Sequence, residues 1–157
     1  MWKAPIRERR KRYVNCCKVR ESPGGAEKGP SGQLGNRLQY AGLREAMHIV
    51  QQGIASAEDV DLAVKTGFGP RLPVYGLFEH QDIVGLDLVR SVSSHVIPDL
   101  NCDSRPPQIL LNLIAQGNLG AKTGRGFLDW SQRDPEETKR RRNEWAYEMM
   151  QRRRKLE

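Results

Sequence analysis

The chain has 157 residues, about the length of one ordinary domain, and a formal net charge of +7. Residues 1–35 hold nine basic and three acidic side chains, residues 131–157 hold nine and six, and residues 36–130 hold eight and ten. A nucleic-acid-binding domain carries its positive charge on the folded body, so this pattern argues against nucleic acid as the main partner. The apolar runs are far too short for a membrane span.

The cysteines and histidines show no pattern of a disulfide framework or a metal site. They are Cys16, Cys17, Cys102, His48, His80 and His95. The first two cysteines are adjacent and cannot easily bridge each other, and the histidines lack ligand spacing. The basic first residues are not followed by the apolar run of a secretory signal. We expect a cytoplasmic protein, with a mitochondrial location as the alternative.

In chain order, residues 1–33 have no helical or strand period and are dense in glycine and proline, which predicts a disordered basic arm. From Leu34 apolar residues recur every three or four positions up to Gly53, which predicts an amphipathic helix. Ser56 then precedes two acidic residues. This pattern predicts that Ser56 is the N-cap of a second helix, which ends near Lys65.

Four more helices are expected beyond the Gly/Pro-rich residues 67–73. They lie near residues 77–84, at 86–97 before Pro98, after the pair Pro106 and Pro107 up to Gly117, and from Asp134 to about residue 154. No segment shows the strand and helix alternation of a parallel sheet. The sequence therefore predicts an all-α protein with a domain at 34–130 and a basic C-terminal helix within 131–157.

The helical periodicity also predicts the core of this domain. We expect the following side chains to be buried together: Leu38, Ala46, Ile49, Val50, Val60, Val64, Phe78, Ile83, Val84, Leu110, Leu113, Ile114 and Phe127.

Three motifs invite a chemical interpretation, and each has a simpler one. Residues 117–124 resemble a phosphate-binding loop, but Ala121 stands where the motif needs glycine and the loop follows a helix, so a tight turn is favoured. Glu79, His80 and Asp82 are neighbours on a helix and do not face one another, so solvated helix residues are favoured over a catalytic set. Around Trp145, the last helix has an apolar side that could dock on its own domain or on another chain.

Several segments, in order along the chain, resemble the C-terminal domain of the L-3-hydroxyacyl-CoA dehydrogenases. Within that family they are similar to the branch that includes lambda-crystallin, the L-gulonate 3-dehydrogenase. They are residues 35–41, 43–46, 53–61, 67–69, 76–79, 82–87 and 117–127. The resemblance implies a helical domain like the C-terminal domain of 6-phosphogluconate dehydrogenase. Such a domain packs against a Rossmann domain and often forms the dimer interface.

In the complete enzymes, NAD and the catalytic histidine belong to the Rossmann part, and the acyl-CoA or hydroxy acid substrate lies between the two domains. This sequence has no GxGxxG and no βαβ pattern, as expected of a truncated or degenerate member. We therefore expect that the chain alone binds no NAD tightly and is inactive. Its expected partners are a second copy, a full-length homologue or a Rossmann domain.

The resemblance also places one substrate-contacting residue at Asn36, within residues 31–37. An asparagine amide can donate to a hydroxyl or keto oxygen without a change of charge. The alternative is that Asn36 satisfies backbone groups at the start of its helix. The leading function is thus the substrate-binding and dimerisation domain of an NAD-dependent dehydrogenase. The alternative function is a non-catalytic helical interaction module.

Overall fold

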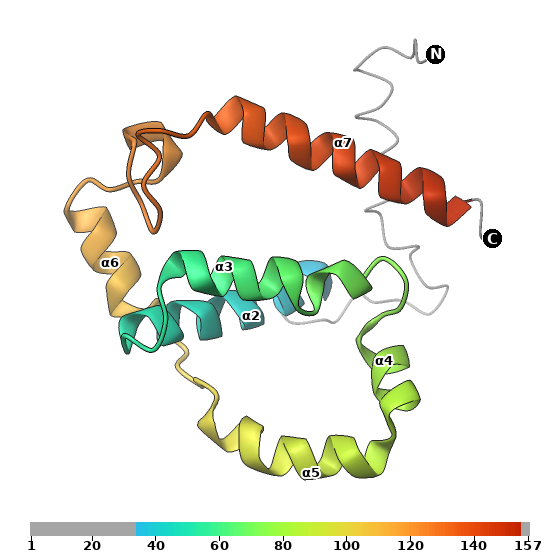
Figure 1. The fold of residues 1–157 in the computed structure, drawn as a ribbon. Coiled ribbons are helices and arrows are strands. Elements are labelled where there is room, and N and C mark those ends of the chain that lie inside the picture. Colours follow the sequence, from blue (N-terminus) through green and yellow to red (C-terminus); the bar gives the residue numbers. More distant parts are fainter. Residues whose placement is uncertain (1–33, 155–157) are drawn as a thin grey trace, which may run out of the picture. The chain divides into compact units, whose positions relative to one another are not determined.

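The structure is a computed structural model that describes residues 34–154 (Figure 1), so the arm predicted at 1–33 lies outside the described residues. The chain divides into two units, Met1–Arg37 and Leu38–Glu157. Over residues 34–154 the regular structure is helical, and β-pairing is limited to two isolated bridges of Arg125, to Gly120 and to Asp129. The all-α prediction is confirmed.

Six α-helices follow one another along the described chain. They are α2 (Leu34–Gln51), α3 (Ala57–Thr66), α4 (Leu77–Val84), α5 (Leu86–Val96), α6 (Gln108–Ala115) and α7 (Pro135–Arg154). Short 3-10 turns lie between them at Gly69–Arg71, Ile97–Asp99 and Ala121–Thr123. These bounds agree with the helices expected from the sequence to within a few residues.

The helix ends are set by the residues that the sequence indicated. The Ser56 hydroxyl accepts from the Asp59 backbone N–H at 3.1 Å, and the Asp59 carboxylate reaches back to the Ser56 N–H, which completes a capping box. The Asp134 carboxylate accepts from the Glu136 N–H at 2.9 Å at the start of α7. Each cap satisfies a backbone donor that the first helical turn leaves without a partner.

Gly85 separates α4 from α5 and turns the chain sharply between them (Figure 1). Its φ of 99° lies in a region that side chains with a Cβ rarely adopt. Its carbonyl still accepts from the Val89 N–H at 3.0 Å, so α5 begins directly at the glycine. A single residue therefore ends one helix and starts the next.

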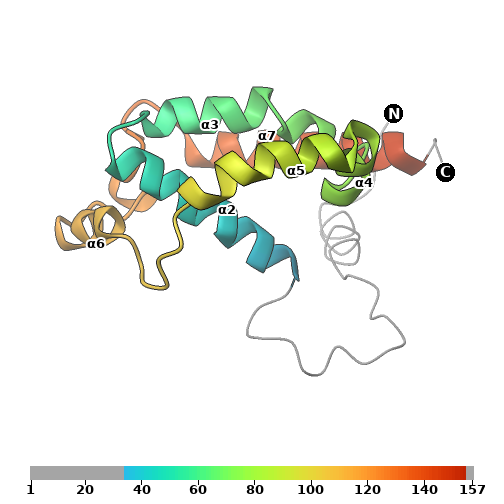
Figure 2. The ribbon, with the colours of Figure 1, turned by 90° about the horizontal axis from the view of Figure 1, so that it is seen from below.

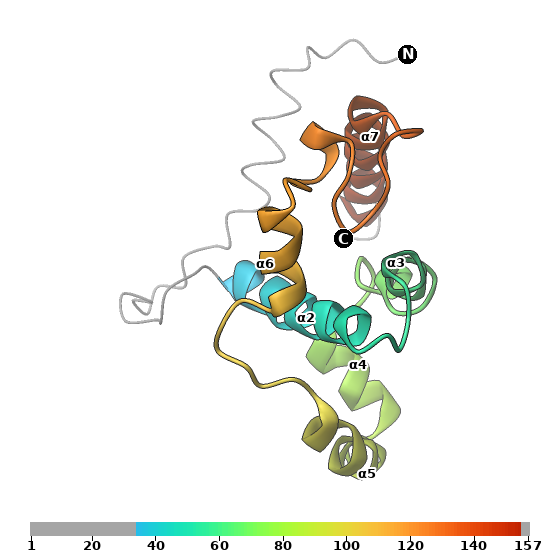
Figure 3. The same ribbon diagram turned by 90° about the vertical axis from the view of Figure 1, so that its left-hand side faces the viewer.

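The segment that leads from α5 to α6 runs beside α2 (Figure 2) and is held there by polar side chains of α2. Glu45 accepts from the Asn101 backbone N–H at 2.8 Å, and the His48 ring contacts the Asn101 amide at 2.8 Å. Gln51 accepts from the Ile109 N–H at 2.9 Å, so α6 begins beside the last turn of α2 (Figure 3). This long-range connection is polar, and the hydrophobic pattern gave no sign of it.

The predicted core is wrong. Within the described residues Met47, at 8% exposure, is the one buried hydrophobic side chain, and none of the thirteen predicted core residues is buried. Phe78 is 88% and Ile83 is 70% exposed. Periodicity identifies which face of a helix is apolar, but it does not determine whether another element of the same chain covers that face.

The basic helix α7 carries its charges at the surface. Glu136 pairs with Lys139 at 2.6 Å, and Glu137 pairs with Arg140, with all four side chains exposed. Such pairs add little to stability. Trp145, on the apolar side that the sequence predicted, is also exposed. No described helix is long and apolar enough to span a membrane.

Candidate functional site

Asn36 lies in the first turn of α2 and is exposed. Its side chain makes no hydrogen bond with the described residues, so the capping role considered from the sequence is not seen there. Asn36 belongs to the first unit, Met1–Arg37, and the features described next belong to the second.

The glycine turn, residues 117–126, satisfies its own polar groups. The Thr123 hydroxyl accepts from the Leu119 N–H at 2.8 Å, and the Gly120 N–H donates to the Arg125 carbonyl at 2.8 Å. The Thr123 and Gly124 N–H groups also donate within the turn. A phosphate-binding loop needs such N–H groups to point at its ligand, so the tight-turn interpretation is confirmed.

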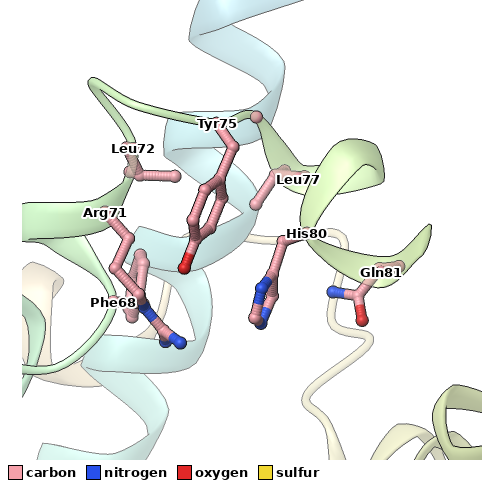
Figure 4. Close-up of a pocket in the computed structure, with 8 residues that line it drawn as sticks. Phe68, Arg71, Leu72, Tyr75, Leu77, His80 and Gln81 are labelled. Carbon is pink, nitrogen blue, oxygen red and sulfur yellow. The ribbon is translucent and has the colours of Figure 1, made fainter. Parts of the chain in front are cut away.

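A second segment, residues 68–81, forms an open hollow of about 280 Å³ between the end of α3 and the start of α4 (Figure 4). It is lined by Phe68, Arg71, Leu72, Tyr75, Gly76, Leu77, His80 and Gln81. The Tyr75 and His80 rings are stacked with centroids 5.2 Å apart and planes 7° apart. The lining therefore combines aromatic faces with a few polar tips, which is the composition of small-molecule sites.

The polar tips of the hollow have no partners among the residues that the structure describes. In residues 34–154, the side chains of Arg71, Tyr75, His80 and Gln81 make no hydrogen bond and no ion pair. In Figure 4 the side chains of Arg71, Tyr75 and His80 extend in the same direction. No acidic residue lines the hollow. These donors are free to bind an anionic group.

The acidic neighbours of His80 do not contribute to the hollow. Glu79 instead accepts from the Gly76 N–H at 3.4 Å at the start of α4. The interpretation of Glu79, His80 and Asp82 as a catalytic set therefore gains no support, but His80 is half-buried against Tyr75 rather than solvated. The sequence analysis missed Arg71 and Tyr75, and an arginine between two prolines in a Gly-rich connection was the available signal.

Metal ligands are not gathered anywhere in the part of the chain that the structure describes, because no three His, Cys, Asp or Glu side chains cluster there. Cys102 is exposed and unpaired, while Cys16 and Cys17 lie outside the described residues.

Comparison with known proteins gives a family match over residues 32–130, to the model described as 3-hydroxyacyl-CoA dehydrogenase, C-terminal domain. A similar curated protein is 5-formyl-3-hydroxy-2-methylpyridine 4-carboxylate 5-dehydrogenase of Mesorhizobium japonicum, 38% identical over 127 residues, which are 80% of this chain and 40% of that protein. Another is the mitochondrial hydroxyacyl-coenzyme A dehydrogenase of Mus musculus, 36% identical over 74% of this chain and 37% of that protein.

A solved structure is also similar, with a TM-score of 0.65 and 34% sequence identity. It is a crystal structure of 5-formyl-3-hydroxy-2-methylpyridine 4-carboxylic acid 5-dehydrogenase, described as an NAD+ dependent dismutase, and the similarity covers 78% of this chain and 39% of that one. The chain thus spans about two fifths of the length of the relatives that it matches.

Proposed function

The chain belongs to the 3-hydroxyacyl-CoA dehydrogenase family as its C-terminal domain, and we propose that it is the substrate-binding and dimerisation domain of an NAD-dependent dehydrogenase. The substrate is a 3-hydroxyacyl-CoA or a related 3-hydroxy acid. A hydroxyacyl-coenzyme A dehydrogenase among the matched relatives supports this class, while another relative acts on a formyl-bearing pyridine carboxylate. The partners of this chain are a second copy, a full-length homologue or a Rossmann domain. We propose the cytoplasm as its location, with the mitochondrion as the alternative that a mitochondrial relative supports.

The observation that carries this proposal is the exposed apolar face of α5. Leu88, Val92 and Val96 recur at every fourth position and are about half exposed. A contiguous apolar stripe of this kind is rare on a protein that acts alone and marks a surface that another chain or domain covers. This supports a domain that completes its core through association.

Asn36 is the proposed substrate contact. Its amide is exposed at the start of α2 and has no partner among the described residues. The amide nitrogen can donate to the hydroxyl or keto oxygen of the substrate and help hold the reacting carbon in position.

NAD does not fit the residues of the described part of the chain. A dinucleotide fold needs a glycine loop between a strand and a helix, with N–H groups directed at the pyrophosphate. Residues 34–154 have no strand, and the Gly120, Thr123 and Gly124 N–H groups of the glycine turn are directed at its own oxygens. No step of the reaction is therefore assigned to a cofactor on this chain, although the solved relative is NAD-dependent.

Reconstitution with the Rossmann domain of a family member tests the proposal. The mixture should reduce NAD with a 3-hydroxy substrate, and the chain alone should not. Asn36→Ala should lower kcat/KM of the mixture by about 100-fold, the usual effect of removing one donor to a reacting oxygen. Asn143→Ala, on the exposed surface of α7, is the matched control and should leave kcat/KM unchanged.

The second candidate function is a non-catalytic helical module that dimerises or binds a homologue, and the same exposed stripe favours it. The two candidates differ in activity. Formation of a stable complex without NAD reduction in any mixture would contradict the enzyme proposal and support the interaction module. A monomer in sedimentation at high concentration, with no complex in any mixture, would contradict both.

A further inference from the structure

We propose that the hollow formed by residues 68–81 binds a small aromatic carboxylate, with the carboxylate on Arg71 and Tyr75 and the ring against the aromatic side chains. The inference rests on the proposed function, because it takes this ligand to be a substrate. It deepens that function by naming the chemical class of the substrate. The binding step itself requires neither NAD nor a second domain.

The charge of the hollow selects an anion. Arg71 is the one cationic side chain among the lining residues, no carboxylate lines the hollow, and the guanidinium makes no ion pair with the described residues. A guanidinium presents its donors in a planar fork that matches the two oxygens of a carboxylate. The Tyr75 hydroxyl and an N–H of the His80 ring add donors among the lining residues (Figure 4).

The walls of the hollow select a flat ring. The stacked Tyr75 and His80 rings, 5.2 Å apart, are already held nearly parallel, and Phe68 supplies a third ring. Aromatic rings attract one another in offset or edge-on arrangements at such separations. Because the Tyr75 and His80 rings are ordered before the ligand arrives, binding loses little side-chain freedom.

The size of the hollow limits the ligand to about one ring. A volume of about 280 Å³ lies just below the usual range for small-molecule sites, roughly 300–1,000 Å³. A monocyclic arene or heteroarene carboxylate fits such a space, whereas coenzyme A, with its nucleotide and long pantetheine arm, does not. The hollow therefore favours a ring carboxylate over an acyl-CoA.

Nuclear magnetic resonance of the full ¹⁵N-labelled chain tests this directly, with three ligands of similar shape. Benzoate carries both the ring and the charge, benzamide carries only the ring, and cyclohexanecarboxylate carries only the charge. Benzoate should bind at least about tenfold more tightly than either control, because a charge-assisted pair and a ring contact each add to the affinity. The amide shifts should concentrate in residues 68–81.

Variants of the full chain assign the binding to Arg71. Arg71→Gln should weaken benzoate binding at least about tenfold, and Arg71→Lys, which keeps the charge but not the fork, should fall between it and the unchanged chain. Arg90→Gln makes the same charge change on the exposed surface of α5, away from the hollow, and should have no effect. His80→Ala should weaken benzoate more than cyclohexanecarboxylate.

Each outcome decides the proposal. Equal affinities for benzoate and benzamide, benzoate binding that Arg71→Gln leaves unchanged, or shifts centred outside residues 68–81 would overturn it. Tighter binding of acetyl-CoA than of benzoate would overturn the assigned class. These results are independent of the reconstitution assay, because an inactive mixture leaves the binding measurement intact and an absence of benzoate binding leaves the dehydrogenase assignment intact.

Discussion

The glycine turn and the hollow are both Gly-rich connections with one or more cations. They differ in whether their polar groups have hydrogen-bond partners within the described chain. In the turn, the Gly120, Thr123 and Gly124 N–H groups and the Thr123 hydroxyl bond to the turn's own carbonyl oxygens. In the hollow, the Arg71, Tyr75 and His80 tips bond to nothing in the described chain. A polar group already paired within the protein has little to gain from a ligand, whereas an unpaired one can gain a full hydrogen bond.

The comparison separates a structural motif from a candidate site by hydrogen-bond satisfaction rather than by composition. It predicts that substitutions in the turn change stability and that substitutions in the hollow change binding. Four changes test this division: two in the turn, one at Asp129 just after it and one in the hollow. They are taken from the largest expected effect on stability to the smallest.

Gly126→Ala should cause the largest loss. A Cβ at Gly126 would lie 2.7 Å from the Gly120 Cα and 3.1 Å from the Gly120 nitrogen, and backbone atoms cannot give way cheaply. We expect a loss of about 1–3 kcal/mol of turn stability, measured as faster amide hydrogen exchange of Gly120 and Gly126. Gly42→Ala in α2 meets nothing within 4 Å and should slow exchange in its helix instead.

Thr123→Val should cost the turn about 1–2 kcal/mol. It removes the hydroxyl that accepts from the Leu119 N–H at 2.8 Å and that contacts the Gly120 and Arg125 carbonyls at 3.1 Å, while the side-chain volume is kept. Hydrogen exchange of the Leu119 amide is the measurement. Thr66→Val is the control, because it removes an exposed hydroxyl that donates to the Leu62 carbonyl. It should lower the stability of its own helix by less than Thr123→Val lowers that of the turn. An equal loss would contradict the special role of Thr123.

The third expected effect is a loss of local stability at low pH, caused by protonation of Asp129. The backbone N–H of Ser131 donates to the Asp129 carboxylate at 2.8 Å, and this bond, with the Ser131 side chain, holds the pKa of Asp129 below its ordinary value of 3.8. Because the folded-state pKa is lowered, the stabilisation is present above about pH 4 and is lost as the pH falls through the lowered value.

Titration of the Ser131 amide shift between pH 6 and 2 should therefore give a midpoint below 3.8. Ser131→Ala should move the midpoint part of the way back, since the backbone donor remains. Asp129→Asn should abolish the transition. A midpoint at or above the ordinary value in the unchanged chain would contradict the assignment.

Arg71→Gln should have the smallest effect on stability, within about 0.5 kcal/mol, because its side chain has no partner to lose in the described chain. Helix content by circular dichroism and the urea midpoint should match the unchanged chain. The same variant is expected to lose benzoate binding, so the two measurements together distinguish a binding residue from a structural one. A large loss of stability would contradict this prediction and would assign Arg71 a structural role like that of the turn residues.

Much of this protein followed from the sequence alone. The start of α3 at Ser56, the start of α7 at Asp134 and the division of α4 from α5 at Gly85 were all predicted, because caps and glycine conformations act over a few neighbouring residues. The family also followed from the order and spacing of short segments, and the match over residues 32–130 bears it out. The role of Asn36 stays a prediction.

The tertiary structure decided what these local signals could not. Periodicity predicted Phe78 and Ile83 as core residues, yet both are exposed. An apolar helix face can be covered by any partner, and no helix within residues 34–154 covers these two side chains. The contacts of Glu45 and His48 with Asn101 join residues more than fifty positions apart. The hollow required the chain to fold back so that Arg71, Tyr75 and His80 share one side, and only coordinates show which polar groups are left without partners.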